Sequence, residues 1–491
     1  MKNIKLNKRF TSRAFAGMFL VLATLISCDD DLNVDPNNVI GEDDFLNNPD
    51  NAVQLVNGVY NKMLDYNMYS FSWIGITSIT SDDADKGSTA SDTGTDKAKM
   101  DNLTFDAQDI SFEDVWKGRY EGVYRANNAL YYLNLLQADP ALKNRLIGEV
   151  KFLRSFWYFD LVRCFGGVPL VLEKIDLNDT EAINEIVFTK RTKEEVYAQI
   201  EADLLDAIEK LPTKSQYAPN DLGRATKGAA QALLAKVYLY QQKWTDAYNM
   251  SGNVISSGEY GLLPNYADVW REVGENKQES VFEVQATLTN GIRDYTNVQG
   301  PRGTPDLGWG FNIPSQALVN SYATGDVRKD ATVLFVPSTL WDGFEAPTTW
   351  SNPRYNYKAY QSSIAESWNN DKGNTAKNLR LLKYSDVLLI RAEAGFQSGQ
   401  TSDLADIIHQ IRERAGLDDI TGITLQDIYK ERRWEMAMEH DRWFDIVRTG
   451  QGPTAMSAVG KTFVTGKHEL FPIPQSQIAT SGGRLIQNNG Y

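Results

Sequence analysis

The sequence predicts an all-α protein, a scaffold of helices that carries long irregular loops and contains little β-structure. The first observation behind this prediction is that apolar residues recur at helical spacings of three and four along much of the chain. The second is that alternation of apolar and polar residues indicates only a short strand, near residues 280–286. The third is a composition of 42% apolar and 23% charged residues in 491. That composition is globular and disfavours disorder, collagen and a coiled coil.

Residues 1–27 are predicted to be a lipoprotein signal peptide. Five positive charges and no acid lie in residues 1–13, which is typical of the first region of an export signal. The apolar run 14–26 has thirteen residues, fewer than the roughly 20 that span a bilayer as a helix. It ends in Leu25-Ile26-Ser27-Cys28, which resembles the lipobox of bacterial lipoproteins and predicts lipidation of Cys28. An ordinary secretory signal and an anchor helix are the alternatives.

Residues 28–44 are predicted to be an acidic, flexible tether. They are rich in Asp, Asn and Pro, and such a segment buries too little surface to fold. The run Asp29-Asp30-Asp31 resembles the signal that sends lipoproteins to the outer face of Bacteroidetes-type cells, whereas in enterobacteria an Asp here indicates retention at the inner membrane. Lipidation of Cys28 leaves Cys164 as the one other cysteine, so no intramolecular disulfide is expected.

Amphipathic helices are expected to fill much of residues 45–270. The last of the four long ones begins with a capping box, with Thr192 as N-cap and Glu195 three residues on, and Pro212 ends it. These four helices are expected at residues 52–66, 120–136, 146–162 and 193–211.

Two helical hairpins are expected to complete the scaffold. The first comprises residues 229–242 and 244–256, and its small and large residues match a tetratricopeptide repeat, in which small residues let two helices pack closely. The second comprises residues 384–397 and 402–415, and residues 426–447 are expected to form a further helix. The residues at repeat offsets in the first hairpin are Leu234, Ala235, Tyr238 and Ala247.

Three stretches lack a helical period and are interpreted as loops: residues 70–106, 287–314 and 337–377. The first is rich in Ser, Thr, Asp and Gly, and the other two in Gly, Pro, Asn and aromatic residues. Long ordered loops in a compact domain are usually functional, so the ligand site is expected there.

The composition excludes several classes of function. A net charge of −14 argues against a nucleic-acid partner, because such binding depends on clustered cations. Three His and two Cys make a zinc site improbable by counting. The segment Gly460-Lys461-Thr462 has Ala455 where a phosphate loop needs Gly, so we reject that interpretation. No metal and no cofactor are therefore expected.

Catalytic patterns are also missing from the sequence. The HExxH and G-x-S-x-G motifs do not occur. Glu431, Glu435 and Glu439 recur every four residues beside arginines, which favours a salt-bridged helix over a hydrolytic carboxylate pair. We therefore expect no catalytic residue and no enzyme activity, although 64 acids leave room for a pair hidden in the loops.

The tryptophans divide into two groups. One group falls in helical periods and is interpreted as core, namely Trp116, Trp157, Trp244, Trp434 and Trp443. The other group falls in the irregular stretches, namely Trp73, Trp309, Trp341, Trp350 and Trp368. A loop Trp beside polar groups suits a sugar, because its flat ring stacks on the C–H face while its neighbours bind hydroxyls. The alternative for each is a small core within its own loop.

Several motifs identify a family. The helix at residues 149–163 (EVKFLRSFWYFDLVR) followed by residues 165–170 (FGGVPL) closely resembles the signature of the SusD/RagB family. Further motifs follow in family order to the end of the chain, so the resemblance covers residues 45–491. These motifs are KGAAQALLAKVYLY at 227–240, LLKYSDVLLIRAEA at 381–394, IRERAGL at 411–417, ERRWEMAMEHDRWFDIVRTG at 431–450, FPIP at 471–474 and QNNGY at 487–491.

The resemblance implies a lipid-anchored protein of the bacterial outer membrane that faces the cell exterior. Such a protein is all-helical with tetratricopeptide-like hairpins, and residues 45–270 and 271–491 would be its N-terminal helical part and its loop-rich C-terminal part. It would capture a glycan for a SusC-like TonB-dependent transporter without being an enzyme. Peptide capture, as in some RagB-like members, is the first alternative, and a surface glycan-active hydrolase is the second.

The ligand site is expected at Trp73 and Trp309, with Tyr295, Arg302 and Asp82 as polar or stacking neighbours. This expectation transfers the position of the family's ligand loops and does not rest on a motif. Trp341 and Trp350 are reserves on the later loop. The cluster Asp82-Asp83-Ala84-Asp85 is interpreted as a solvated loop, with a Ca²⁺ site as the alternative. Arginines of the family motifs are instead expected to form ion pairs that lock helices together, namely Arg154, Arg163, Arg442 and Arg448, beside Asp160 and Asp445.

Overall fold

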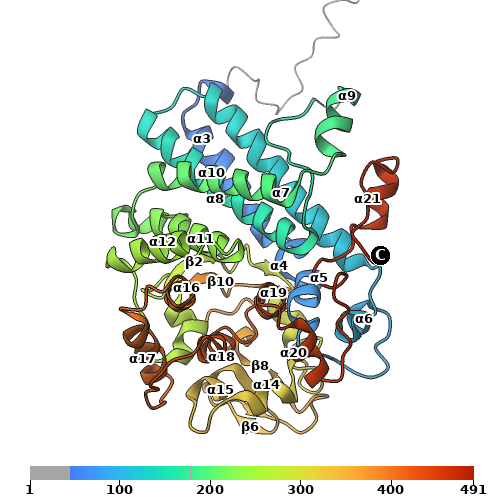
Figure 1. Cartoon of the computed structure of the whole chain (residues 1–491), viewed down its shortest axis with the longest axis vertical. Helices are drawn as coiled ribbons and strands as arrows, with labels where there is room; N and C mark the ends of the chain where they lie inside the picture. Colours follow the sequence, from blue (N-terminus) through green and yellow to red (C-terminus); the bar gives the residue numbers. More distant parts are fainter. Residues whose placement is uncertain (1–44, 177) are drawn as a thin grey trace, which may run out of the picture.

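Helices dominate the computed structural model, which describes residues 45–176 and 178–491 (Figure 1). The long helices of the N-terminal half are α3 (Asp50–Asn61), α7 (Ile110–Leu135), α8 (Pro140–Phe165), α10 (Lys193–Lys210), α11 (Lys227–Tyr240) and α12 (Trp244–Ser256). They pack in chain order, α7 on α8, α8 on α10, α10 on α11 and α11 on α12. The predicted all-α fold class is therefore confirmed. The predicted signal peptide, lipidation site Cys28 and tether lie outside the described residues.

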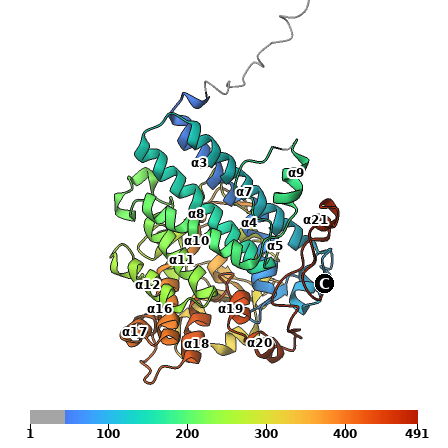
Figure 2. The ribbon, with the colours of Figure 1, turned by 45° about the horizontal axis from the view of Figure 1, so that its top comes forward.

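The second predicted hairpin consists of α16 (Tyr384–Ser398) and α17 (Leu404–Arg414). Its first helix packs against α12 of the first hairpin, and both figures of the whole chain show the two hairpins next to each other (Figure 2). Ala247 and Ala394 are fully buried at this contact beside Tyr248. Small residues thus allow the close packing that the sequence indicated.

Local sequence explains where the long helices begin, meet and end. The capping box of Thr192 and Glu195 forms as predicted at the start of α10. On α7, Gly122 lies against the ring of Trp157 on α8, where a Cβ would come 2.7 Å from ring carbons. Gly166 then ends α8 with a φ of 73°, a conformation that favours glycine.

The β-structure is limited to short antiparallel pairs among the described residues. The predicted strand at 280–286 is β2 (Ser280–Val284), which pairs with β10 (Leu379–Lys383) ahead of α16. The other strands come from the loops and pair as β1 (Ala84–Gly87) with β4 (Phe311–Pro314), β3 (Ile292–Arg293) with β9 (Asn374–Thr375), β5 (Val333–Phe335) with β8 (Arg354–Asn356) and β6 (Ser338–Thr339) with β7 (Glu345–Ala346).

Shorter helices fill the connections. They are α6 (Lys97–Asn102), α9 (Thr180–Ala182), α13 (Tyr295–Gln299), α14 (Gln316–Ser321), α15 (Val327–Thr332), α20 (Gly452–Ala458) and α21 (Gln475–Thr480). None of the helices in the described part of the chain is long and apolar enough to cross a membrane.

The stretch beginning at residue 70 is not a loop throughout, contrary to the prediction. α4 (Tyr66–Tyr69), α5 (Phe71–Ile74) and a π-helical turn at Gly75–Ile79 form a buried helical segment. Thr77 Oγ1 donates to the carbonyl of Trp73 at 2.6 Å, and Ser72 Oγ donates to Asp114 Oδ2 at 2.6 Å. Serine and threonine residues can be buried when their hydroxyls form hydrogen bonds within the protein. The abundance of these residues was therefore wrongly interpreted as a loop.

The helix predicted at 426–447 is broken into α18 (Leu425–Glu435) and α19 (Arg442–Arg448). Between them, Met438 and His440 adopt positive φ angles of 63° and 69°. Non-glycine residues rarely adopt this conformation, and it turns the chain so that both helices face the core. The helical period continues through the break, so the sequence could not reveal it.

A network of buried ion pairs connects six helices in the interior. Its members come mainly from the family motifs, and it links α7, α8, α11, α16, α18 and α19. The pairs are Arg119–Asp160 (2.9 Å), Arg163–Asp160 (2.6 Å), Arg163–Asp441 (3.2 Å), Lys236–Asp386 (3.0 Å), Lys236–Asp441 (2.5 Å), Arg432–Asp386 (2.6 Å), Arg432–Asp445 (2.8 Å), Arg448–Asp445 (2.8 Å) and Arg448–Glu393 (2.6 Å). Arg154 pairs with Asp203 and Arg442 with Asp82, each at 2.8 Å. The prediction that these arginines lock helices is confirmed for Arg154, Arg163 and Arg448, whereas Arg442 joins α19 to the non-helical residues before β1.

Candidate functional site

Two segments of the C-terminal half, residues 296–307, which begin within α13, and residues 359–372, face each other across a cavity of about 320 Å³. We call this cavity the loop cleft. Both segments belong to stretches that the sequence analysis interpreted as functional loops. The residues that line it are Thr296, Gly300, Pro301, Asp306, Leu307, Phe344, Ala359, Tyr360, Gln361, Ser363, Trp368, Asn370 and Lys372.

Backbone hydrogen bonds hold the first wall of the cleft in place. The amide of Trp309 donates to the carbonyl of Asn297 at 2.7 Å, and that of Gly310 to Gly300 at 2.8 Å. Gly308 permits this fold, because a Cβ there would lie 2.4 Å from the carbonyl oxygen of Asn297. The loop is therefore rigid without regular secondary structure.

Side-chain hydrogen bonds hold the second wall. The amide nitrogen of Asn369 donates to the carbonyls of Leu288 and Asn374, each at 2.9 Å. The hydroxyl of Tyr360 donates to Asp342 Oδ2 at 2.7 Å. The wall that carries Trp368 is thus anchored to neighbouring loops.

The cleft presents an aromatic ring among amides and one ion pair. Trp368 is half-buried, and its Nε1 donates to Asn370 Oδ1 at 3.1 Å, which orients the ring. Lys372 Nζ reaches across to Asp306 Oδ2 at 2.8 Å and connects the two walls. Gln361 donates to the carbonyl of Ser367 at 2.7 Å, while its Oε1 has no partner. A ring to stack on and amides to bind hydroxyls are the groups that a sugar requires.

Two of the five predicted ligand residues, Arg302 and Trp309, belong to the loop that forms the first wall. Arg302 has 42% of its side chain exposed, and it binds Ser88 Oγ at 2.7 Å and Asp92 Oδ2 at 2.9 Å. Trp309 is half-buried with its ring edge-on to Phe71, 5.7 Å between centroids. Both lie beside the loop cleft but outside its lining.

Trp73 and Tyr295 are in the interior, so the structure corrects their assignment as ligand contacts. Trp73 is 4% exposed on α5, with the guanidinium of Arg119 4.1 Å from its ring. Tyr295 is buried, and its hydroxyl lies 3.1 Å from Nε2 of His440. Burial raises the pKa of Tyr295 above its usual value, and burial lowers the pKa of His440 to about 4. Both rings line one cavity of about 40 Å³ in the interior, and neither belongs to the lining of the loop cleft.

Asp82 is also buried, and its carboxylate forms ion pairs that hold the fold together. Its carboxylate lies 2.8 Å from Arg442 and 3.0 Å from Arg433. Burial acts to raise the pKa of Asp82, but the two arginines outweigh it and lower the pKa to about 2. The interpretation of residues 82–85 as a solvated loop is therefore wrong for Asp82 and Asp83, both of which pair with these arginines. Nowhere in the described part do three or more His, Cys, Asp or Glu gather where a metal ion could bind.

The remaining loop tryptophans differ in their roles. Trp350 is buried in a small core of its own loop with Phe344 and Tyr355, and its Nε1 donates to the carbonyl of Pro305 at 2.8 Å. Trp341 is 36% exposed. Trp368 lines the loop cleft, and the sequence named it only as one loop tryptophan among five. No local pattern singles it out.

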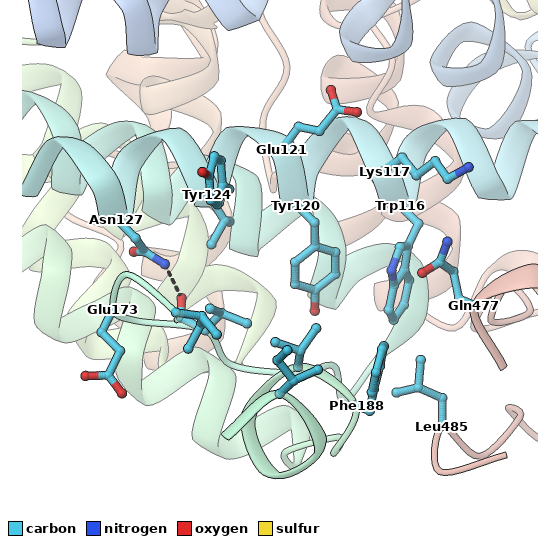
Figure 3. Close-up of a pocket in the computed structure, with 15 residues that line it drawn as sticks. Trp116, Lys117, Tyr120, Glu121, Tyr124, Asn127, Glu173, Phe188, Gln477 and Leu485 are labelled. Atoms are coloured by element: carbon cyan, nitrogen blue, oxygen red, sulfur yellow. Dashed lines mark hydrogen bonds between the residues drawn. The ribbon is translucent and has the colours of Figure 1, made fainter. Parts of the chain in front are cut away.

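A second, larger cavity of about 370 Å³ lies along α7 (Figure 3). Trp116 and Tyr120 of α7 face Phe188 and Leu485 across it, whereas the carboxylate of Glu121 points away from these rings. The side-chain amide nitrogen of Asn127 donates a hydrogen bond to the carbonyl of Val171 at 2.9 Å. The wall is therefore almost wholly apolar, and sugar hydroxyls would find few partners there.

The fold and the loop cleft together define a class: a helical-repeat scaffold that presents a cleft on its loops. Two family models match the chain, one described as "SusD family" over residues 278–491 and one described as "Starch-binding associating with outer membrane" over residues 35–239. The chain belongs to the SusD/RagB family.

Curated relatives match most of the chain. SusD-like protein P2 of Formosa agariphila is 26% identical, and the match covers 96% of this chain and 98% of that protein. A SusD-like protein of Bacteroides ovatus is 28% identical, covering 70% of this chain and 66% of that protein.

Solved structures agree with the fold. A laminarin-binding SusD-like protein superposes with a TM-score of 0.76 at 29% identity, covering 91% of this chain and all of that one. Surface glycan-binding protein A from Bacteroides thetaiotaomicron gives a TM-score of 0.78 at 24% identity, covering 91% of this chain and 99% of the other. The second comparison supports the fold alone.

Proposed function

We propose that the protein is a surface lipoprotein that captures an oligo- or polysaccharide in the loop cleft. It then delivers the glycan to a SusC-like TonB-dependent transporter of the outer membrane. The observation that carries the proposal is the fixed ring of Trp368 among Gln361, Asn370 and Ser363. The similarity to a laminarin-binding relative makes laminarin, a β-1,3-glucan, the first ligand to test.

A binding role without catalysis is supported by the charges in the cleft. Glycoside hydrolysis generally requires two carboxyl groups, about 5 to 9.5 Å apart. Among the described residues that line the cleft, Asp306 is the one carboxylate, and it is paired with Lys372. The cleft is therefore suited to holding a sugar without cleaving it.

Trp368→Ala is expected to weaken laminarin binding by about tenfold or more. Loss of a stacking ring costs roughly 1–3 kcal/mol at base-stacking aromatics, which are the nearest analogue. Isothermal titration calorimetry measures the affinity, and circular dichroism checks the fold. Trp244→Ala, which removes a half-buried ring from the scaffold helix α12, is the matched control and should bind as wild type. A folded Trp368→Ala protein that binds within twofold of wild type would place the site elsewhere.

A further inference from the structure

A third cavity, of about 230 Å³, opens beside the loop cleft and is walled by aromatic residues. Trp270, Trp341, Tyr357 and Tyr360 line it, and we call it the Trp341 pocket. Tyr360 also lines the loop cleft, so the two cavities share a wall. A glycan seated in the cleft could extend one of its residues or substituents into this pocket.

Lys377 is a buried cation of the Trp341 pocket with no carboxylate of its own. It is 7% exposed, and its Nζ donates to the carbonyl oxygen of Tyr360. Among the described residues, none forms an ion pair with it; Glu366 and Glu275 attract it only from further away. Burial lowers the pKa of Lys377 to about 8, because an ammonium deprived of water and of a close counter-charge is costly.

Two further donors line the same pocket. The guanidinium of Arg271 lies 4.5 Å from the centre of the Trp341 ring, and it pairs with the surface carboxylate of Asp268 at 2.9 Å. The indole Nε1 of Trp270 has no hydrogen-bond partner although the residue is buried. Two cationic residues and a tryptophan with an unused N–H therefore line one small cavity.

Arg271 is paired with Asp268, whereas no carboxylate among the described residues forms an ion pair with Lys377. Asp330 is the one carboxylate among the described residues that line the pocket, and it is exposed, where water and salt screen its charge. Lys377 is buried and its charge is screened much less. The pocket is therefore locally cationic, although the whole chain carries a net charge of −14.

We propose that the Trp341 pocket binds an anionic substituent of the captured glycan, either a uronate carboxylate or a sulfate ester. The ring of Trp341 stacks on the sugar, while Lys377 and Arg271 bind its charged oxygens. Such charge-assisted hydrogen bonds are roughly twice as strong as neutral ones. The inference rests on the proposed function and assigns a charge to the ligand of that site.

The test compares three probes that share one backbone: laminarin, laminarin oxidised at C6 to the uronate, and sulfated laminarin. Calorimetry at 25 °C and near-physiological salt should show at least one anionic probe binding about tenfold or more tightly than laminarin. The uronate and sulfate arms distinguish the two sources of charge. Because the net charge of the chain repels polyanions, tighter binding cannot come from its overall field.

Lys377→Met and Arg271→Gln should each abolish most of this preference, measured as the ratio of the affinities for an anionic probe and for laminarin in the same variant. Arg271 is part-exposed, so its replacement should not prevent folding. If Lys377→Met fails to fold, the Arg271→Gln variant alone tests the proposed anion binding. Lys430→Gln is the control, since it removes one exposed charge far from the pocket in sequence, on α18.

Two results would overturn the inference. One is wild-type protein that binds laminarin at least as tightly as both anionic probes. The other is a preference for anionic probes that survives in the variants. Either result leaves the glycan-binding proposal intact, whereas failure of all three probes to bind would count against the proposed function itself.

Discussion

Asp160→Asn should lower the free energy of unfolding by about 3–5 kcal/mol, the cost of breaking a buried ion pair by removing one partner. Asp160 and Arg119 are both fully buried, with 2.9 Å between Oδ2 and Nη2, and Arg163 binds the other carboxylate oxygen at 2.6 Å. The amide that replaces the carboxylate carries no charge. Two guanidinium groups would then lose their shared counter-charge inside the core.

Urea denaturation followed by circular dichroism measures this effect. Lys430→Gln is the matched control, because its pair with Asp427 is exposed with 3.8 Å between the atoms, and such surface pairs contribute roughly 0–1 kcal/mol. A loss in Asp160→Asn no larger than that of the control would show that the interior network does not hold the helices together.

Cys28→Ala should release the protein from the membrane almost completely. Residue 28 lies outside the described part of the chain, and the expectation rests on the sequence Leu25-Ile26-Ser27-Cys28. Thioether-linked lipid is the anchor that this sequence predicts, and stable anchoring depends on acyl chains buried in the bilayer. Membrane fractionation of cells, with detection of the protein in each fraction, gives the result.

Cys164→Ala provides the control for loss of a cysteine. Its sulfur is buried in α8 and unpaired, so this variant should stay in the membrane fraction. In a strain without the transporter, a Cys28→Ala protein that still pellets with membranes would contradict lipid anchoring. Replacement of Asp29 to Asp31 by Ala should keep the lipid but reduce cleavage by protease added to whole cells.

The scaffold could be predicted because its causes are local. Apolar spacing, the capping box at Thr192 and the small residues of the hairpins each act within a few turns of helix. The break between α18 and α19 could not be predicted, because Met438 and His440 adopt positive φ within a continuous helical period. Long-range packing imposes that turn.

The proposed ligand site was harder to predict because burial is a long-range property. Trp73, Trp350 and Trp368 all lie in stretches that lack a helical period, yet one joins the main core, one fills a loop core and one lines a cleft. Which ring faces solvent depends on partners distant in sequence, such as Arg119 over Trp73. Residue type and neighbours could not reveal it.

The family motifs and the ligand site occupy different parts of the molecule. Arg163, Asp386, Arg432 and Asp445 belong to motifs and form the interior network. Residues of the loop cleft come from stretches without such motifs. Motifs could therefore identify the scaffold, and only the structure shows which loop residues meet in a cleft.

The proposed function requires that this protein bind a glycan without cleaving it. Its most direct test is calorimetric titration of the lipid-free mature protein with laminarin oligosaccharides, followed by an assay for new reducing ends in the same mixtures. Saturable binding with no new reducing ends is the predicted result. Release of reducing ends, or binding of peptides with no binding of laminarin or its anionic derivatives, would contradict it.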